Sequence, residues 1–147
     1  MTKTFIKGNY TLSTDKTKLD LDAIHHYLTR SYWSTGIPKE VIAGAIEGSL
    51  CFGLYHEQEQ VGFARVITDT STFAYLADVY ILKPHRGQGL SRWMMEVIMN
   101  YPSLQGLRRW MLATKDAHGL YKKFGFTPLE KVELFMEISV PNIYLQE

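Results

Sequence analysis

One short stretch of the sequence, LKPHRGQGLS at residues 82–91, sets Arg86 beside Gly87 and Gly89 directly after an apolar run. Arginine offers a charged fork of N–H donors, and glycine lets the backbone take positive φ and come close to a ligand. A strand that turns through such residues into a helix leaves free N–H groups at the positive end of the helix dipole, where phosphate binds. The stretch therefore predicts a phosphate cradle, although an ordinary turn between a strand and a helix shares its composition.

Two common phosphate-binding motifs are excluded at this loop. A P-loop needs Gly-Lys-Ser/Thr after a four-residue gap, and the stretch contains no such sequence. A dinucleotide-binding turn needs a third glycine and an acidic residue about 20 positions further on. Position 92 is an arginine, and residues 103–112 contain no carboxylate. Neither motif explains the two glycines.

Asp78 is a carboxylate in the middle of an apolar run, four residues before this stretch. Burial favours the neutral form of a carboxyl group, which would suit a proton acceptor in catalysis. Two other interpretations carry similar weight. In the first, Asp78 is a structural carboxylate whose partner is Arg65 or the hydroxyl of a tyrosine. In the second, it binds the ammonium group of an acceptor.

The number and spacing of the cysteine and histidine residues argue against a metal site and against thiolate chemistry. Cys51 is the only cysteine, which rules out an internal disulfide and a thiolate-rich metal site. Its apolar setting, LCFGLY, favours core packing over a role as a nucleophile. His25 and His26 are adjacent, so on a helix they point in different directions and do not share a metal. We therefore expect no metal.

The whole chain has the size and charge of a single enzyme-like domain. Its 147 residues, 46% of them hydrophobic, are enough for one compact domain, to which we assign residues 1–147. The 16 basic and 15 acidic residues nearly cancel, so no nucleic-acid partner is expected. No run approaches the roughly 18 apolar residues of a membrane span, and residues 1–8 do not resemble a signal peptide. A cytoplasmic protein follows by default.

The spacing of apolar residues predicts the elements that must position these side chains. Strands are expected at residues 5–12, 50–55, 61–68, 73–82, 109–114 and 132–140, and helices after Asp20 or Asp22, after Pro38, from Leu90, and from Asp116 to Phe124. Short polar turns join the three central strands, so those strands should be antiparallel neighbours. The order predicts an α/β fold, a mixed, mostly antiparallel sheet flanked by helices.

Two segments in this order, DVYILKPHRGQGLS and ATKDAHGLYKKFGF, resemble the GNAT superfamily of N-acetyltransferases. The superfamily's motif, Arg/Gln-x-x-Gly-x-Gly/Ala at the end of the fourth strand, binds the pyrophosphate of coenzyme A. Arg86, Gly89 and Ser91 occupy its three specified positions, and Ser91 is the departure. Serine is small and has a hydroxyl that can itself reach a phosphate, so the substitution is tolerable. The resemblance implies the GNAT-like acyl-CoA N-acyltransferase fold, with acetyl-CoA as co-substrate.

The resemblance also implies which residues hold the coenzyme. The pyrophosphate would contact the loop Arg86, Gly87, Gln88, Gly89, Leu90 and Ser91, and the pantetheine arm would pair with backbone groups of Val79, Tyr80 and Ile81. A backbone N–H of that strand can also polarise the thioester carbonyl. Where the family often has asparagine, Thr114 or Asp116 would take over the coenzyme contacts.

Tyr121 is the catalytic residue that the resemblance points to. LYKKFGF matches the pattern Leu-Tyr-x-x-x-Gly-Phe, in which the family's tyrosine protonates the departing sulfur of coenzyme A. A phenol with its ordinary pKa near 10 is protonated at neutral pH and can donate to a thiolate. Direct transfer needs no acyl-enzyme, and Asp78 is the candidate base. The other interpretation is a tyrosine that only packs the last helix.

The acceptor is expected near HHYLTRSYWSTGIP, where family members commonly form the acceptor pocket. Tyr32 and Trp33 would line that pocket or stack on a cationic amine, or else serve as core anchors. The function predicted is acetyl transfer to a primary amine, favouring a small molecule. The alternative is a non-catalytic acyl-CoA-binding or regulatory module. A homodimer through an edge strand near residues 132–140 is an option that no feature of the sequence fixes.

Overall fold

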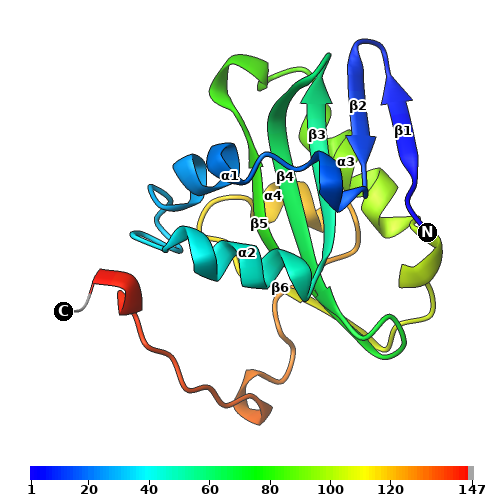
Figure 1. Ribbon diagram of the computed structural model, residues 1–147. Coiled ribbons are helices and arrows are strands. Elements are labelled where there is room, and N and C mark those ends of the chain that lie inside the picture. The colour runs from blue at the N-terminus through cyan, green and yellow to red at the C-terminus, as the bar shows by residue number, and fades with distance from the viewer. Residues whose placement is uncertain (146–147) are drawn as a thin grey trace.

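A single six-stranded sheet organises the protein in the computed structural model, which describes residues 1–145 (Figure 1). The strands lie in chain order: β1 Thr4–Lys7, β2 Tyr10–Ser13, β3 Leu50–His56, β4 Glu59–Thr68, β5 Phe73–Ile81 and β6 Arg109–Leu112. Neighbours from β1 to β5 are antiparallel, and β6 runs parallel to β5. The mixed, mostly antiparallel sheet predicted from the sequence is thus confirmed.

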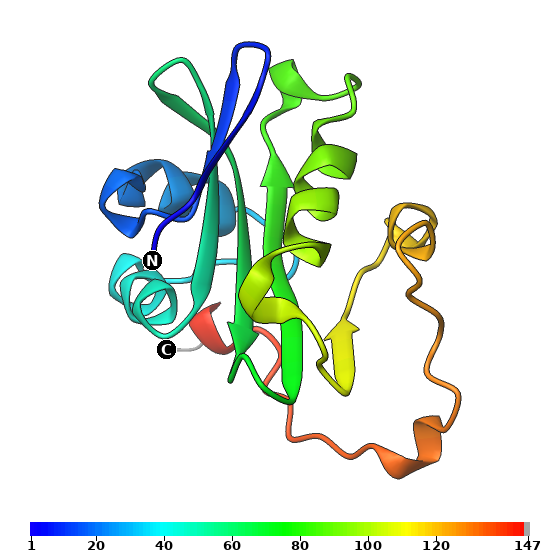
Figure 2. The same ribbon diagram turned by 90° about the vertical axis from the view of Figure 1, so that its right-hand side faces the viewer.

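Four α-helices accompany the sheet: α1 Leu21–Leu28, α2 Lys39–Glu47, α3 Leu90–Met99 and α4 His118–Lys122. Figure 2 shows α1 and α2 on one face of the sheet and α3 on the other. Asp20 begins α1, because its side chain accepts a hydrogen bond of 3.0 Å from the N–H of Ala23. The single strand predicted at residues 5–12 is wrong: Gly8 turns the chain with a φ of 59°, and a hairpin of β1 and β2 forms instead.

The sheet separates two apolar clusters. The larger one lies under α3 and includes Phe52, Met94 and Ile98, each with no exposed surface. The smaller one lies under α1 and α2 and includes Ile24, Leu28, Ile42, Phe63 and Tyr80. Because both faces of β3, β4 and β5 are covered, these strands are apolar almost throughout rather than alternating.

A β-bulge interrupts β5 at Asp78. Ala64 of β4 faces two residues of β5, Asp78 and Val79, and the φ of Asp78 is 54°. The bulge shifts the alternation of side chains by one position, so Leu76 and Ile81 lie in the same cluster under α3. Strict alternation along the strand would have placed them on opposite faces.

β5 and β6 stay together for only part of their length. They pair from Phe73 with Arg109 to Leu76 with Leu112, where β6 ends. Beyond that point the chain after β6 turns away toward α4, while β5 continues to Ile81 (Figure 2). In residues 1–145, no strand pairs with the β6-side edge of β5 from Ala77 onward.

The strand predicted at residues 132–140 is also wrong. Val132–Leu134 forms one 3-10 turn, and the chain then runs extended to a second turn, Ile143–Leu145. Figures 1 and 2 show this segment leaving the body of the protein and returning on the side of α2. A strand exists only where a neighbouring backbone completes its hydrogen bonds, and no other described segment lies alongside.

Candidate active site

The Arg86 loop sits where β5 passes into α3. A 3-10 turn, Lys83–His85, follows β5, and Gly89 precedes the first residue of α3 in the left-handed conformation. Gly87 and Gly89 both have a φ of 81°, a value that strains any residue with a Cβ. In the described chain, the N–H groups of residues 87–90 donate to no protein acceptor. The loop therefore offers a set of unpaired donors at a helix start.

Side chains of the loop hold its shape. The Nε of Arg86 donates to the carbonyl of Ile81 at 2.7 Å, and its Nη2 donates to the hydroxyl of Tyr27 at 3.1 Å. Gln88 donates through Nε2 to the hydroxyl of Tyr10 at 3.1 Å and to the carbonyl of His85 at 3.0 Å. These bonds fix the loop from both ends and leave Nη1 of Arg86 without a protein partner among the described residues.

The remaining residues of the predicted pyrophosphate site lie in the first turn of α3. Leu90 is buried in the core, so only its backbone faces the loop. Ser91 is the second residue of the helix and half-buried. A hydroxyl in a helix's first turn lies near the same unpaired N–H groups.

Side chains of the three predicted pantetheine residues pack against the two clusters. Ile81 and Val79 contact the cluster under α3, and Tyr80 stacks on Tyr27 with ring centres 3.9 Å apart. Tyr80 and Ile81 are buried and Val79 is half-buried, so a ligand at this edge meets mainly their backbone groups. That backbone belongs to the unpaired edge of β5.

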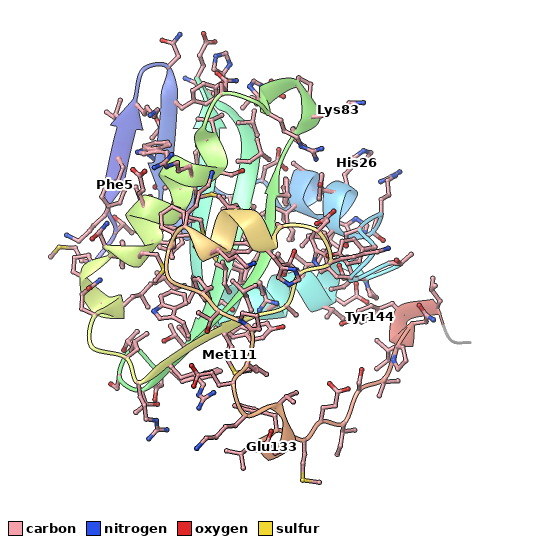
Figure 3. The ribbon with its side chains drawn as sticks, turned by 180° about the vertical axis from the view of Figure 1, so that it is seen from behind. Phe5, His26, Lys83, Met111, Glu133 and Tyr144 are labelled. Atoms are coloured by element: carbon pink, nitrogen blue, oxygen red, sulfur yellow. The ribbon has the colours of Figure 1, made fainter. Side chains whose placement is uncertain are left out.

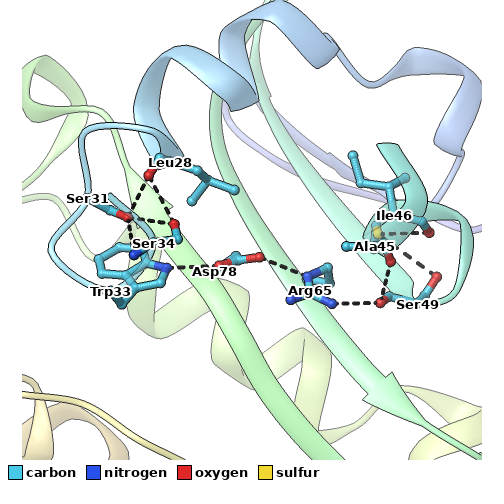
Figure 4. A network of polar contacts seen from close by, with 10 residues as sticks. Leu28, Ser31, Trp33, Ser34, Ala45, Ile46, Ser49, Arg65 and Asp78 are labelled. Carbon is cyan, nitrogen blue, oxygen red and sulfur yellow. Dashed lines mark hydrogen bonds and ion pairs between the residues drawn. The ribbon is translucent and has the colours of Figure 1, made fainter. Parts of the chain in front are cut away.

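Asp78 lies at the centre of a polar network (Figure 4). Its Oδ1 accepts a hydrogen bond of 2.8 Å from Nε1 of Trp33, and its Oδ2 accepts one of 2.8 Å from Nε of Arg65. The side chains of Arg65 and Asp78 are only 16% and 11% exposed. Arg65 also donates through Nη1 to Ser49, whose hydroxyl donates to the carbonyl of Ala45. The network joins the loop after α1 to the end of α2 through the bulge.

Tyr32 and Trp33 are not core anchors. They are 54% and 41% exposed, and their rings meet edge to face with centres 5.1 Å apart. The hydroxyl of Tyr32 accepts a hydrogen bond of 3.0 Å from the N–H of Lys115, on the chain between β6 and α4. This contact brings the loop after α1 next to the segment that carries Tyr121.

Tyr121 is buried, with 7% of its surface exposed, on α4. Its hydroxyl makes no hydrogen bond to any described residue, and the hydroxyl oxygen keeps some solvent-accessible surface. The pKa of Tyr121 is raised to about 12, mainly by burial and to a smaller extent by the nearby phenol of Tyr32 and carboxylate of Asp116. The phenol is therefore protonated and free to donate.

Thr114 and Asp116 lie on the chain between β6 and α4. Asp116 does not cap α4, because the helix begins after Ala117 and the carboxylate of Asp116 is exposed. The Oγ1 of Thr114 accepts a hydrogen bond of 3.2 Å from the N–H of Ala117, the residue before the helix. This bond orders the turn that leads into α4.

Tyr27 belongs to this region and was missed by sequence analysis. It contacts Arg86 by a hydrogen bond, stacks on Tyr80, and lies with its ring centre 6.4 Å from that of Trp33. In the sequence it falls on the apolar face of α1 with Ile24 and Leu28, where it is indistinguishable from a core residue.

No described residues form a group of three or more His, Cys, Asp or Glu side chains that could hold a metal. Over the same residues, no helix combines the length and apolar character needed to cross a membrane.

Cys51 lies 1% exposed behind the network, and burial raises the pKa of its thiol to about 11. The thiolate is the reactive form of cysteine. Because the pKa stands about two units above the ordinary 9.0, the native protein at pH 8 should react with a disulfide reagent about 100-fold more slowly than the unfolded chain. Absorbance of the released thiol in buffer and in denaturant measures both rates. Equal rates would contradict an inert, packed cysteine.

Comparison with known proteins connects this geometry to a family. The family model described as an acetyltransferase (GNAT) domain matches residues 47–128, more than half of the chain. The chain belongs to the GNAT acetyltransferase family. The match runs from the end of α2 through α4 and so includes the Arg86 loop, the β5 bulge and Tyr121.

Individual GNAT relatives agree with the family match. A protein of Gibberella zeae, provisionally named an acetyltransferase, is 39% identical over an alignment of 140 residues that covers 80% of this chain and 78% of that protein. A crystal structure from Xanthomonas campestris pv. campestris, provisionally assigned to the GNAT family, has a TM-score of 0.91 and 48% identity, covering 93% of this chain and 97% of that one. The GNAT resemblance and the acetyltransferase class predicted from the sequence are therefore confirmed.

A more distant GNAT-like fold has been solved with its coenzyme. The structure of an acetyltransferase from Clostridium acetobutylicum with acetyl-CoA has a TM-score of 0.64 at 15% identity, covering 95% of this chain and 96% of that one. At this identity the likeness concerns the fold alone.

Proposed function

We propose that this GNAT acetyltransferase moves the acetyl group of acetyl-CoA directly to a primary amine of a small molecule. The observation that carries the proposal is the unpaired edge of β5, which begins beside the Arg86 loop and passes the bulge at Asp78. Tyr121 lies on the helix across from this edge, with a hydroxyl that has no protein partner among the described residues. The family and the acetyl-CoA complex of the Clostridium acetobutylicum relative support acetyl-CoA as the donor.

The pyrophosphate of acetyl-CoA would bind at the Arg86 loop. The free N–H groups of residues 87–90 supply donors, and the dipole of α3 favours the negative charge. Arg86 adds a full charge, and its Nη1 can reach the phosphate while Nε stays on Ile81. Ser91 supplies one further hydroxyl.

The pantetheine arm would extend along β5 from Ile81 toward the bulge. Its two amides can pair with backbone groups of Val79, Tyr80 and Ile81 as an added strand would. The thioester then lies near the bulge, where a backbone N–H that no neighbouring strand uses can hold the oxyanion of the tetrahedral intermediate. Thr114 and Asp116, on the chain that leads into α4, would contact the coenzyme from that side.

The chemistry proposed is a single direct transfer. The neutral amine attacks the thioester carbon and forms the carbon–nitrogen bond of a tetrahedral intermediate, which then collapses as the carbon–sulfur bond breaks. Tyr121 donates its proton to the departing thiolate, and the proton of the new ammonium group leaves to Asp78 or to water. No acyl-enzyme is involved, in keeping with the inert Cys51 thiol.

Asp78 would mainly orient the acceptor amine. Each of its oxygens already accepts one hydrogen bond, from Trp33 and from Arg65, and each keeps a second lone pair for an ammonium group. Tyr32 and Trp33, exposed and close together, provide faces on which a cationic amine can stack. A small acceptor with an aromatic or apolar part beside its amine suits these surfaces.

Titration of the protein with acetyl-CoA by calorimetry, with ATP as control, tests the donor. The same preparation is then supplied with small primary amines while release of the coenzyme thiol is followed. Saturable binding of acetyl-CoA together with thiol release would support the proposal. Binding without turnover on any amine would favour the alternative, an acyl-CoA-binding module. Absence of binding by folded protein would overturn both.

Charge reversal at Arg86 gives a sharper test of the pyrophosphate site. The Arg86→Glu variant should bind acetyl-CoA roughly 10- to 100-fold more weakly, because hydrogen bonds to charged groups contribute about 1.5–3 kcal/mol. Lys18→Glu makes the same change of charge at an exposed residue far along the chain and should leave the affinity unchanged. Equal dissociation constants for the two variants in calorimetry would mean that the loop is only a turn.

A further inference from the structure

The Arg86 loop contains two glycines that leave its backbone free to move. Gly87 and Gly89 both have a φ of 81°, and Gln88 is the residue between them. Glycine loses more backbone freedom than any other residue when a chain becomes ordered. The N–H groups of residues 87–90 donate to no acceptor in the described chain, so they do not hold the loop. A single shape of residues 87–89 therefore depends on the side chain of Gln88.

Gln88 is held by a residue from a distant part of the chain. Its Nε2 lies 3.1 Å from the hydroxyl oxygen of Tyr10, the first residue of β2, and 3.0 Å from the carbonyl oxygen of His85. Tyr10 and Gln88 are 78 positions apart in the sequence. The same hydroxyl lies 2.8 Å from Nδ1 of His85, in the turn before the loop. One phenol thus ties the chain on both sides of Arg86 to the sheet.

The donors and acceptors in this cluster follow from the chemistry of the groups. A carbonyl oxygen can only accept, so the amide nitrogen of Gln88 is the atom that faces the carbonyl of His85. The same nitrogen donates to the phenol oxygen of Tyr10. The proton of the phenol is then available to Nδ1 of His85, which accepts it when the neutral imidazole carries its own proton on Nε2. The hydrogen bonds run in one direction, from Gln88 through Tyr10 to His85.

The ring of Tyr10 is itself held in place. Its centre lies 4.9 Å from that of His56, its cross-strand neighbour on β3, and 5.8 Å from that of His85, edge to face. The ring also packs against the cluster under α3. Figures 2 and 3 show the tip of the β1–β2 hairpin and the turn that contains Lys83 at the same end of the sheet. A strand of the sheet therefore presents the hydroxyl to the loop in a fixed position.

We propose that Tyr10 is a positioning residue for the coenzyme and acts through the bonded chain Gln88–Tyr10–His85, a role that rests on the pyrophosphate site proposed above. Because the side chain of Gln88 is turned back toward β2, the N–H groups of the loop stay free for anionic oxygens. The loop is already ordered before the coenzyme arrives, so binding costs less conformational entropy. Coupling between two sites is reciprocal, so bound coenzyme should in turn stabilise the β1–β2 hairpin.

Tyr10→Phe removes the hydroxyl and keeps the ring. It should raise the dissociation constant for acetyl-CoA in calorimetry, and the KM for acetyl-CoA, about threefold to tenfold, the usual effect of one neutral hydrogen bond. The value of kcat should stay the same, because the thioester reacts near the bulge at Asp78 and not at the loop. General damage to the fold would lower kcat as well. An unchanged dissociation constant would overturn the role of Tyr10.

Tyr101→Phe is the matched control. Tyr101 is 5% exposed in the cluster under α3, and its hydroxyl donates to Oγ1 of Thr14 at 3.3 Å and to no residue of the loop. This variant also loses one phenol hydrogen bond and should lower the midpoint of urea denaturation, yet it should bind acetyl-CoA as the unchanged protein does. If it weakened binding as much as Tyr10→Phe, stability alone would explain both effects, and the positioning role would be wrong.

A double variant tests whether Tyr10 acts through Gln88. Gln88→Met keeps the length of the side chain and removes the amide. Two residues that act through one hydrogen bond do not contribute independently. The loss of affinity in Tyr10→Phe combined with Gln88→Met should therefore be smaller than the product of the two separate losses. Losses that multiply would contradict the bonded chain.

Hydrogen exchange measures the reciprocal effect on the hairpin. Saturating coenzyme A should slow the exchange of the amides that pair β1 with β2 by up to the same threefold to tenfold factor. In Tyr10→Phe the coenzyme should leave these amides unaffected. Equal slowing in both proteins, or none in the unchanged protein, would contradict the coupling.

Nitrogen-15 NMR of the free protein tests the direction of the bonds without any coenzyme. Neutral His85 should carry its proton on Nε2, and a proton on Nδ1 would overturn the chain from Gln88 to His85. Failure of the unchanged protein to bind acetyl-CoA would overturn the proposed function and this role together. Normal binding that Tyr10→Phe does not weaken would overturn the role of Tyr10 and leave the proposed function intact.

Discussion

Replacing Tyr121 with phenylalanine is expected to lower kcat by about 100- to 10,000-fold, the usual contribution of a positioned general acid. The phenylalanine ring keeps the packing of Tyr121 against Phe126, whose ring centre lies 6.0 Å away. The hydroxyl bonds to no described residue, so its removal should leave the free energy of unfolding nearly unchanged. Steady-state kinetics with a primary amine, followed by thiol release, measures the effect.

Affinity for acetyl-CoA separates catalysis from binding in this variant. The dissociation constant should stay within a few-fold of the unchanged protein, since the pyrophosphate site lies on a different loop. Tyr75→Phe, which removes a hydroxyl elsewhere on β5, should keep full activity. A Tyr121→Phe enzyme with a normal kcat would assign the tyrosine to packing alone.

The pH profile should reflect the raised pKa of Tyr121. A general acid must be protonated, and a phenol with a pKa of about 12 loses its proton only as pH rises toward that value. Ionisation of Tyr121 therefore removes no activity below about pH 11. Any decline of kcat at lower alkaline pH belongs to another group.

The second large effect is on stability, at the ion pair of Arg65 and Asp78. Arg65→Met should lower the free energy of unfolding by about 3 kcal/mol, because it leaves a largely buried carboxylate without its charged partner. The pair is 16% and 11% exposed, which places the expected loss at the lower end of the range for buried pairs. Urea denaturation should show a lower midpoint with an unchanged slope.

A double variant separates the structural role of Asp78 from its role toward the acceptor. Arg65→Met combined with Asp78→Leu should regain most of the lost stability, since an apolar pair of similar volume often replaces a buried ion pair without loss. If Asp78 also binds the amine, this stable protein should have a KM for the amine raised about tenfold or more. Its affinity for acetyl-CoA should not change. An unaltered KM for the amine would make Asp78 a structural residue.

Local patterns were enough to predict much of the fold. The three central strands and the helix from Leu90 follow from apolar runs, short polar turns and a glycine-rich loop, all of which act over a few residues. The covering of both sheet faces by helices follows from the order of these elements. The GNAT family came from the types and spacing of residues in two segments.

Features that depend on distant contacts were not predictable. The bulge at Asp78 requires a φ of 54°. Aspartate tolerates that conformation better than most residues, but its presence alone does not tell a bulge from a buried functional carboxylate. Residues 132–140 alternate apolar and mostly polar side chains as a strand would, yet pairing is a property of two segments, and no described segment pairs with them. The role of Tyr27 was not predictable, because its place on the apolar face of a helix is also that of an ordinary core residue. In the structure, its hydroxyl accepts a hydrogen bond from Arg86.

The strict chain order of the strands bears on how the protein reaches its folded state. Each strand pairs with the strand next to it in sequence, and short connections between β3, β4 and β5 make closing those loops cheap in conformational entropy. The connection from β2 to β3 contains α1 and α2, and the connection from β5 to β6 contains α3. Pairing of β2 with β3 and of β6 with β5 therefore closes longer loops. Folding should therefore start at β3–β5 and reach β6 late. The outer edge of β6 would be the last part of the sheet to form and the first to open.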